Sequence, residues 1–173
     1  MPPVFPGVER SRRDRSNFLI PVVFDMSSTY LGLHYHVVFS TKHREPLIKR
    51  DWLPELHDYM GGIIRGLKGT PRYVGGVSDH VHLLFDLNAT HTLSEIMREL
   101  KKASSTWCRG QRGGKDFVWQ EGYSAFTVSA TALGAVGSYI LNQEEHHRTK
   151  SFREELIELL EKAGVHYDPK YLD

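Results

Sequence analysis

Two histidines separated by a single valine constrain this chain more than any other feature. They lie in the run Val77–Phe85, where His80-Val81-His82 is followed by apolar residues. The run predicts a β-strand, in which alternate side chains point to opposite faces, so His80 and His82 share one face. Two neutral imidazoles side by side can hold a divalent metal and leave room for a third protein ligand and for substrate oxygens. The alternative is a pair of histidines on the solvated face of a half-buried strand.

A second stretch, residues 137–147, offers the polar groups that such a site still needs. Tyr139, Gln143 and His146 are spaced i, i+4 and i+7, so they lie on one face of a predicted helix. A separate apolar face of the same helix can dock on a sheet. The tyrosine therefore stands one helical turn from an amide that can complete a metal site.

Together these stretches resemble the single-tyrosine HUH transposases, a family that includes transposase A of insertion sequences and the REP-associated tyrosine transposases. The resemblance runs from about residue 30 to residue 172 and includes four motifs in order. They are Tyr35–Lys42, Asp79–Leu84, Trp119–Tyr123, and Tyr139 with Gln143. Several ordered motifs over most of the chain make this a specific signal.

The resemblance implies a transposase that cleaves and rejoins single-stranded DNA at hairpins by metal-dependent transesterification. It implies that Tyr139 is the nucleophile, which would form a 5′-phosphotyrosine intermediate, and that His80, His82 and Gln143 bind Mg²⁺ or Mn²⁺. It also implies a homodimer with shared active sites, in which the tyrosine helix of one subunit completes the histidine site of the other. Such an enzyme would act in the cytoplasm, on the DNA of the nucleoid.

Three other functions fit the same motifs. A domesticated relative would keep the nuclease chemistry and process chromosomal repeat hairpins instead of moving its own element. A noncatalytic module would bind single-stranded nucleic acid, because this type of sheet also serves RNA recognition through stacked aromatic side chains. A generic histidine–metal hydrolase would turn over without any covalent protein adduct.

The order of the predicted elements indicates an α+β fold. Strands and helices follow one another as β-α-β-β-α-β, which is the ferredoxin-like topology with an antiparallel sheet, and the fold of the resembling family agrees. A helix that carries Tyr139 and a final helix follow, the latter capped by Ser151-x-x-Glu154. The first two helices would cover one face of the sheet and leave the other for the histidines, the tyrosine helix and DNA. The predicted strands span about 30–41, 72–77 and 80–87, residues 117–129 are expected to form a last strand or strand pair, and the tyrosine helix spans about 130–147.

Composition allows one globular domain and does not by itself indicate DNA binding. The 173 residues, 40% of them hydrophobic, suffice for one core, which we assign to residues 26–173. The net charge of +1 means that DNA affinity must come from local basic patches. We expect residues 1–25 to be an N-terminal extension that is flexible or not native, and their apolar run 18–24 is too short for a bilayer, which takes about 20 residues. No membrane partner is therefore expected, and the lone Cys108 excludes an internal disulfide.

Further candidates surround these motifs with weaker support. Asp79 can orient a histidine ligand or simply serve a turn. His36 can approach the metal site, face DNA or play a structural part, and His146 can contact DNA or tune the site. Basic side chains in a loop and on the second predicted helix can neutralise phosphates or remain solvated. These are Lys42, Arg44, Lys101 and Lys102.

Overall fold

Four antiparallel strands form a sheet that carries helices on both faces. Its spatial order is β2-β3-β1-β4, so the two central strands are those that contain the first two motifs. The strands are β1 (His34–Ser40), β2 (Thr70–Gly76), β3 (His80–Asp86) and β4 (Ser124–Thr127). The computed structural model describes residues 30–111 and 116–172. The predicted ferredoxin-like fold is confirmed, because the β-α-β-β-α-β order and the antiparallel sheet are both present.

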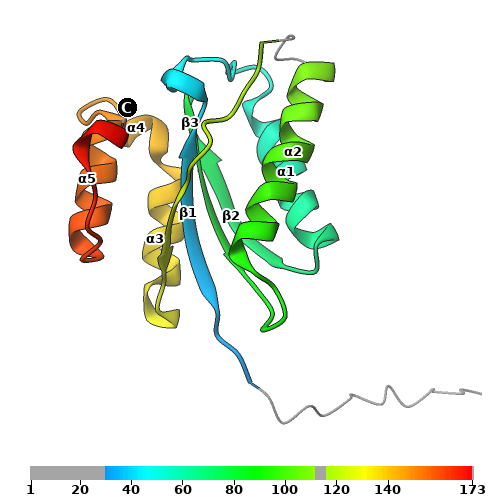
Figure 1. Cartoon of the computed structure of the whole chain (residues 1–173), viewed down its shortest axis with the longest axis vertical. Helices are drawn as coiled ribbons and strands as arrows, with labels where there is room; N and C mark the ends of the chain where they lie inside the picture. Colours follow the sequence, from blue (N-terminus) through cyan, green and yellow to red (C-terminus); the bar gives the residue numbers. More distant parts are fainter. Residues whose placement is uncertain (1–29, 112–115, 173) are drawn as a thin grey trace, which may run out of the picture. The chain divides into compact units, whose positions relative to one another are not determined.

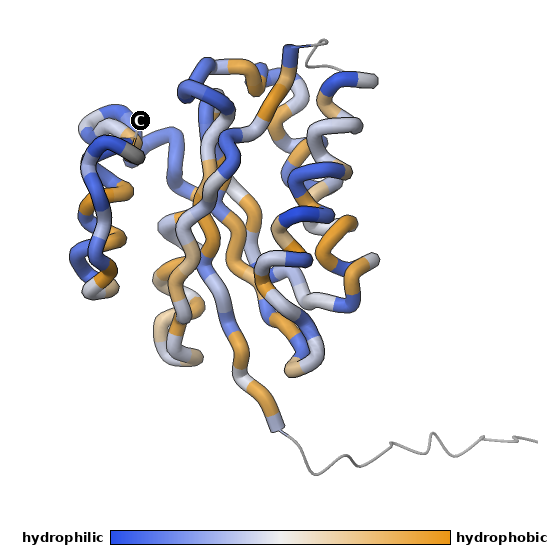
Figure 2. The backbone as a smooth tube through the Cα atoms, viewed as in Figure 1, coloured by the Kyte–Doolittle hydropathy of each residue, from blue (hydrophilic) through white to orange (hydrophobic). Residues whose placement is uncertain are grey.

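Helices α1 (Leu53–Gly66) and α2 (Leu93–Gln111) cover one face of the sheet (Figure 1). Hydrophobic segments recur along both helices and along the strands beside them (Figure 2). The residues that meet there form the main core, and burying them from water supplies most of its stability. Its fully buried members include Val37, Phe39, Leu56, Met60, Ile64, Val81, Leu83, Phe85 and Leu100.

The opposite face carries the C-terminal helices, α3 (Leu133–Leu141), α4 (Gln143–His146) and α5 (Phe152–Lys162) (Figure 1). Helix α5 begins with the predicted capping box, in which the Ser151 hydroxyl accepts a hydrogen bond from the Glu154 amide. Its apolar residues form a second, smaller cluster with one residue of β1 and with Leu172 near the end of the chain. The buried members of this cluster are Val38, Phe152, Leu156, Leu160 and Leu172.

Two glycines let α3 lie directly on β2. A Cβ atom on Gly75 of β2 would collide with the backbone carbonyl of Ile140, and one on Gly137 of α3 would collide with the ring of Tyr73. Larger residues would push the helix away from the sheet. The close approach therefore fixes the height of Tyr139, two residues after Gly137, above the histidine strand.

The structure differs from prediction at the tyrosine helix and at the last strand. The predicted continuous helix over 130–147 is wrong, because it is interrupted at Asn142, whose φ of −100° and ψ of 23° are not helical. The Asn142 side chain donates to the carbonyl of Ser138, a local bond that competes with helix continuation. Residues 117–129, predicted as a last strand or strand pair, form only the short β4 and an isolated bridge between Thr41 and Trp119.

The described residues from Leu31 onward form one compact unit. The predicted extension over residues 1–25 and the boundary at residue 26 lie outside the described residues. Within the described ranges, no helix has the length and apolar character needed to cross a bilayer.

Candidate active site

The paired histidines lie on β3, between β2 and β1, with both side chains fully buried. Ser40 of β1 pairs with His80, and Val38 of β1 and Gly75 of β2 flank His82 in the sheet. Val81 between them belongs to the main core on the opposite face. The predicted alternation is therefore present, and both imidazoles point to the side of α3 and α5.

Each strand histidine has its Nδ1 atom engaged away from the cluster. The Nδ1 of His80 lies 2.7 Å from the Asp79 carboxylate, and the Nδ1 of His82 lies 3.0 Å from Nε2 of His36. A hydrogen on Nδ1 leaves the Nε2 lone pair free as a metal ligand, and such partners orient metal-binding histidines. Asp79 thus contacts the histidine that it would orient, and His36 contacts His82.

Tyr139 and Gln143 are brought to the same histidines despite the break at Asn142. The ring of Tyr139 packs edge-on against the rings of His82 and His36, with centroids 5.7 and 6.2 Å apart. The Gln143 side chain is buried, and its Oε1 lies 3.3 Å from Nε2 of His80. The structure therefore brings together all four residues predicted as nucleophile and ligands.

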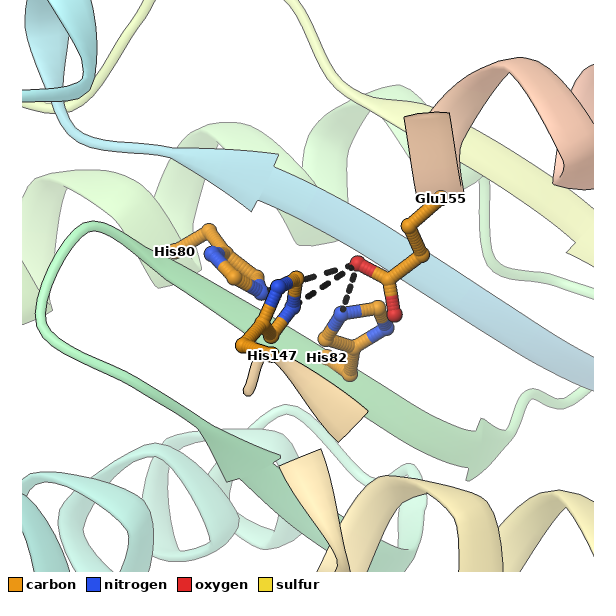
Figure 3. A group of neighbouring side chains, drawn as sticks. All are labelled: His80, His82, His147 and Glu155. Atoms are coloured by element: carbon orange, nitrogen blue, oxygen red, sulfur yellow. Dashed lines mark ion pairs between the residues drawn. The ribbon is translucent and has the colours of Figure 1, made fainter. Parts of the chain in front are cut away.

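Two residues that the sequence analysis did not assign to the metal site complete this cluster, namely His147 and Glu155. The Oε2 atom of Glu155 lies 3.1, 3.5 and 3.7 Å from the Nε2 atoms of His147, His82 and His80, respectively (Figure 3). Four ligand atoms, one from each residue, lie within 4.8 Å of one another. Glu155 is 2% exposed, although it belongs to a helix that carries several charged side chains. The only signal in the sequence is its place beside Leu156 in the apolar stripe of α5.

The other carboxylate oxygen of Glu155 faces the nucleophile. Oε1 accepts hydrogen bonds from the Tyr139 hydroxyl and, at 2.9 Å, from Nε2 of Gln143. His146 also approaches this oxygen, at 3.6 Å, and its ring lies 5.2 Å from that of Tyr139. A single buried carboxylate thus connects the tyrosine to the histidine cluster.

Burial and the Glu155 charge set the electrostatics of the site. Burial lowers the pKa of His82 to about 4, which Glu155 only partly offsets, so this imidazole is neutral at pH 7. Burial also raises the pKa of Tyr139 above its ordinary value, and the Glu155 carboxylate adds to this shift. For Glu155 itself, burial opposes the charge, but the imidazoles of His147 and His82 outweigh it and hold its pKa well below its usual range. The free tyrosine hydroxyl is therefore protonated and needs help to act as a nucleophile.

The donor set fits a divalent cation. Nε2 of His82 and Oε2 of Glu155 are buried without a hydrogen-bond partner among the described residues, so two lone pairs point into the cluster unused. Ligands at about 2.0–2.2 Å from one ion lie roughly 3.0–3.5 Å from each other, close to the 3.1–3.7 Å between Glu155 Oε2 and the three Nε2 atoms, while the whole set lies within 4.8 Å. Imidazole and carboxylate are common ligands for Zn²⁺, Mn²⁺ and related ions.

Basic side chains border the cluster on one side. A groove of about 510 Å³ is lined by Asp79 and His147 together with Arg44, Arg148 and Lys150. Tyr139 and His146 line a second groove, of about 400 Å³. A phosphate in the first groove would lie beside these three cations, of which Arg148 also pairs with Glu145 and Lys150 with Glu158.

The remaining basic candidates divide into two kinds. Lys42 is exposed near the start of a 3-10 turn, Lys42–Arg44, and Lys102 is exposed on α2 beside Arg98 and Arg109. Lys101 points elsewhere, because its ammonium donates to the backbone carbonyls of residues 120, 121 and 122, and it sits over the ring of Phe39. Lys101 therefore braces the 120–122 loop, whereas Lys102 remains available to a phosphate.

Comparisons with known proteins agree with this geometry. The family model described as "Transposase IS200 like" matches residues 29–143. A structure from Deinococcus radiodurans R1, named as a candidate transposase, is 25% identical over 66% of this chain and 93% of its own, with a TM-score of 0.52. A REP-associated tyrosine transposase bound to a REP hairpin shares the fold, with 16% identity, a TM-score of 0.51, and coverage of 81% of this chain and 74% of its own.

No curated protein matches the chain in sequence. The family match nevertheless spans more than half of the chain and includes the histidine strand, Tyr139 and Gln143. His147 and Glu155 lie beyond the matched residues. On this evidence the chain belongs to the family of IS200-like transposases.

Proposed function

We propose that this transposase cleaves and rejoins single-stranded DNA through a covalent bond to Tyr139. The supporting observation is that the Tyr139 hydroxyl and the Nε2 atoms of His80 and His82 all face one buried carboxylate. A nucleophile and a metal site that share a carboxylate can act on the same phosphate. The family match supplies the substrate class, which is DNA.

In the proposed reaction the Tyr139 oxygen attacks the scissile phosphorus and the bond from phosphorus to the 3′-oxygen breaks. The products are a 5′-phosphotyrosine and a DNA 3′-hydroxyl, and the tyrosine proton leaves as the 3′-oxygen gains one. Attack by a 3′-hydroxyl at a new junction reverses the step and restores the tyrosine. The covalent bond conserves the phosphodiester energy, so strand transfer needs no nucleotide cofactor.

A divalent cation held by His80, His82 and Gln143 would polarise the phosphate and stabilise the charge that develops on it. His36 and Asp79 would orient the two histidines through their Nδ1 atoms. Mg²⁺ prefers oxygen ligands, whereas imidazole suits softer ions, so we expect both Mg²⁺ and Mn²⁺ to support the reaction and Mn²⁺ to bind more readily.

We propose DNA hairpins at element ends as the substrate, which the enzyme would meet in the cytoplasm at the nucleoid. The relative of similar fold was solved with a REP hairpin. In this chain Arg98, Lys102 and Arg109 border a groove of about 420 Å³ between α2 and the 118–123 loop, and α2 covers the sheet face opposite the histidine cluster. Contacts there could hold a duplex stem through its phosphates.

The test is a denaturation-resistant adduct between the protein and labelled single-stranded hairpins in the presence of Mn²⁺. We expect an adduct for the unaltered chain and for Tyr59→Phe, a matched tyrosine on α1, and none for Tyr139→Phe. Hairpin binding without an adduct would replace this proposal by the noncatalytic module, and cleavage without an adduct would replace it by the metal hydrolase.

A homodimer with shared sites stays a prediction. In the structure Tyr139 reaches the histidines of its own chain, an arrangement that needs no second subunit. Mixing Tyr139→Phe with His82→Ala distinguishes the two cases. An adduct restored by mixing would show that one subunit supplies the tyrosine and the other the histidines, whereas none would be restored if each chain uses its own.

A further inference from the structure

We propose that Glu155 is itself a ligand of the metal ion, through Oε2, while its Oε1 holds the Tyr139 hydroxyl, and that His147 joins His80 and His82 in the same coordination shell. The inference rests on the proposed function for the presence of the ion. It extends the metal centre to two residues of the C-terminal segment, beyond the part of the chain that matches the family.

The first support is the orientation of the three histidines. His147 Nδ1 lies 2.8 Å from the carbonyl oxygen of Lys150, which can only accept, so this nitrogen carries a hydrogen. His80 Nδ1 faces the Asp79 carboxylate in the same way, and His82 Nδ1 faces His36. Three histidines from two different segments therefore turn their Nε2 atoms to one point, as metal ligands do.

The second support is the position of Glu155 Oε2 at that point. It is buried, it has no hydrogen-bond partner among the described residues, and three Nε2 atoms surround it at 3.1 to 3.7 Å (Figure 3). Gln143 Oε1 faces the cluster too, 3.0 Å from His147 Nε2. Buried acceptors that converge in this way need either a proton on an imidazole, as in the ion pair of Glu155 with His147, or a metal cation between them.

The third support is that the two oxygens of the Glu155 carboxylate face different partners. Oε1 is already satisfied by the Tyr139 hydroxyl and the Gln143 amide, so only Oε2 is available to an ion. A carboxylate that binds the ion with one oxygen and the nucleophile with the other fixes the distance between them. Glu155 is thus a positioning residue for Tyr139 as well as a ligand.

The ligand set predicts which divalent ions support adduct formation. Three imidazoles and one carboxylate fill a tetrahedral Zn²⁺ completely, and a closed site has no position for a phosphate oxygen. A six-coordinate ion such as Mn²⁺ keeps two positions open with these four ligands, and still one when Gln143 is the fifth. We therefore expect Zn²⁺ to bind tightly and block adduct formation, and Mn²⁺ to support it.

The experiment measures Mn²⁺ binding to the full chain without DNA, by electron paramagnetic resonance of the free ion. We expect Glu155→Gln to weaken binding about 10- to 100-fold, while Glu161→Gln, an exposed glutamate on the same helix, binds like the unaltered chain. Equal affinity of the unaltered chain and Glu155→Gln, with matching circular dichroism, would overturn the proposal.

A second measurement needs no substitution at the site. In protein labelled with ¹³C at the glutamate side-chain carboxyl, electron–nuclear double resonance of bound Mn²⁺ should detect one directly coordinated carboxylate, and its absence would overturn the proposal even if Glu155→Gln does not fold. Both readouts are independent of DNA. A lost adduct with intact Glu155-dependent Mn²⁺ binding would refute only the proposed function, and an adduct without Glu155-dependent binding would refute only this inference.

Discussion

His80 and His82 belong to a central strand whose other face lies in the main core, whereas His147 and Glu155 belong to a segment held by a small apolar cluster and by the site itself. The strand is hydrogen-bonded on both edges, to β1 and to β2. Helix α5 packs through Phe152, Leu156 and Leu160. The half of the site on β3 is therefore rigid before any ligand binds, whereas the half on the C-terminal segment can be stabilised by the ion that it binds.

The rigid half should dominate metal binding. We expect His82→Ala to weaken Mn²⁺ binding by more than about 100-fold and to abolish the DNA adduct, because it removes a ligand and leaves His36 without its partner. Titration of Mn²⁺ and the adduct assay measure both effects. His166→Ala, at an exposed histidine, is the control, and near-normal Mn²⁺ affinity in folded His82→Ala would contradict the strand-based site.

A displacement of Tyr139 should affect the rate of adduct formation more than the affinity for the metal. A methyl group at Gly137 meets the Tyr73 ring and lifts α3, so we expect Gly137→Ala to slow adduct formation by about 100-fold, as misplacement of a reacting group by about 1 Å can do. Gly134→Ala on the same helix meets nothing and should react normally. Similar adduct rates for the two variants would show that the close helix approach does not position the nucleophile.

The C-terminal half should contribute a smaller share of the affinity. We expect His147→Ala to weaken Mn²⁺ binding about tenfold, at the low end of the range for groups that support a metal site, and to leave the melting temperature of the apoprotein nearly unchanged. Calorimetric titration and thermal unfolding measure this. A loss as large as that of His82→Ala would mean that the two halves are equally rigid.

The smallest expected effect is on local motion. Amides of α5 should exchange hydrogen faster than those of β3. Saturating Mn²⁺ should slow the exchange of the α5 amides several-fold and leave the exchange rate of the β3 amides unchanged. Hydrogen exchange followed by mass spectrometry compares the two peptides in one sample. If Mn²⁺ slowed exchange equally in α5 and β3, or did not slow it in α5, the C-terminal half of the site would be no more mobile than the strand half.

The fold and the strand half of the site could be predicted because their signals are local. The two-residue repeat of a strand places His80 and His82 on one face whatever the rest of the chain does. Helical spacing brought Tyr139 near Gln143, and the capping box at Ser151 identified the start of α5. The break at Asn142 was missed, because a single polar side chain bonded to Ser138 outweighs the periodicity around it.

Glu155 and His147 could not be assigned as ligands in the same way. A glutamate at the edge of an apolar stripe reads as a solvated residue, and only the folding of α5 back onto β1 buries it against histidines about 70 positions earlier. Lys101 shows the converse, because a lysine that looks available to DNA is tied to three backbone carbonyls. Local periodicity does not show which distant residues such side chains contact in the folded chain.

The most direct measurement counts the imidazoles bound to Mn²⁺. Pulsed electron paramagnetic resonance of protein with ¹⁵N-labelled histidine resolves the nitrogens coordinated to the ion. We predict three in the unaltered chain, from His80, His82 and His147, and two in His147→Ala. Two in the unaltered chain, with no change in His147→Ala, would show that the C-terminal segment lies beside the metal centre without belonging to it.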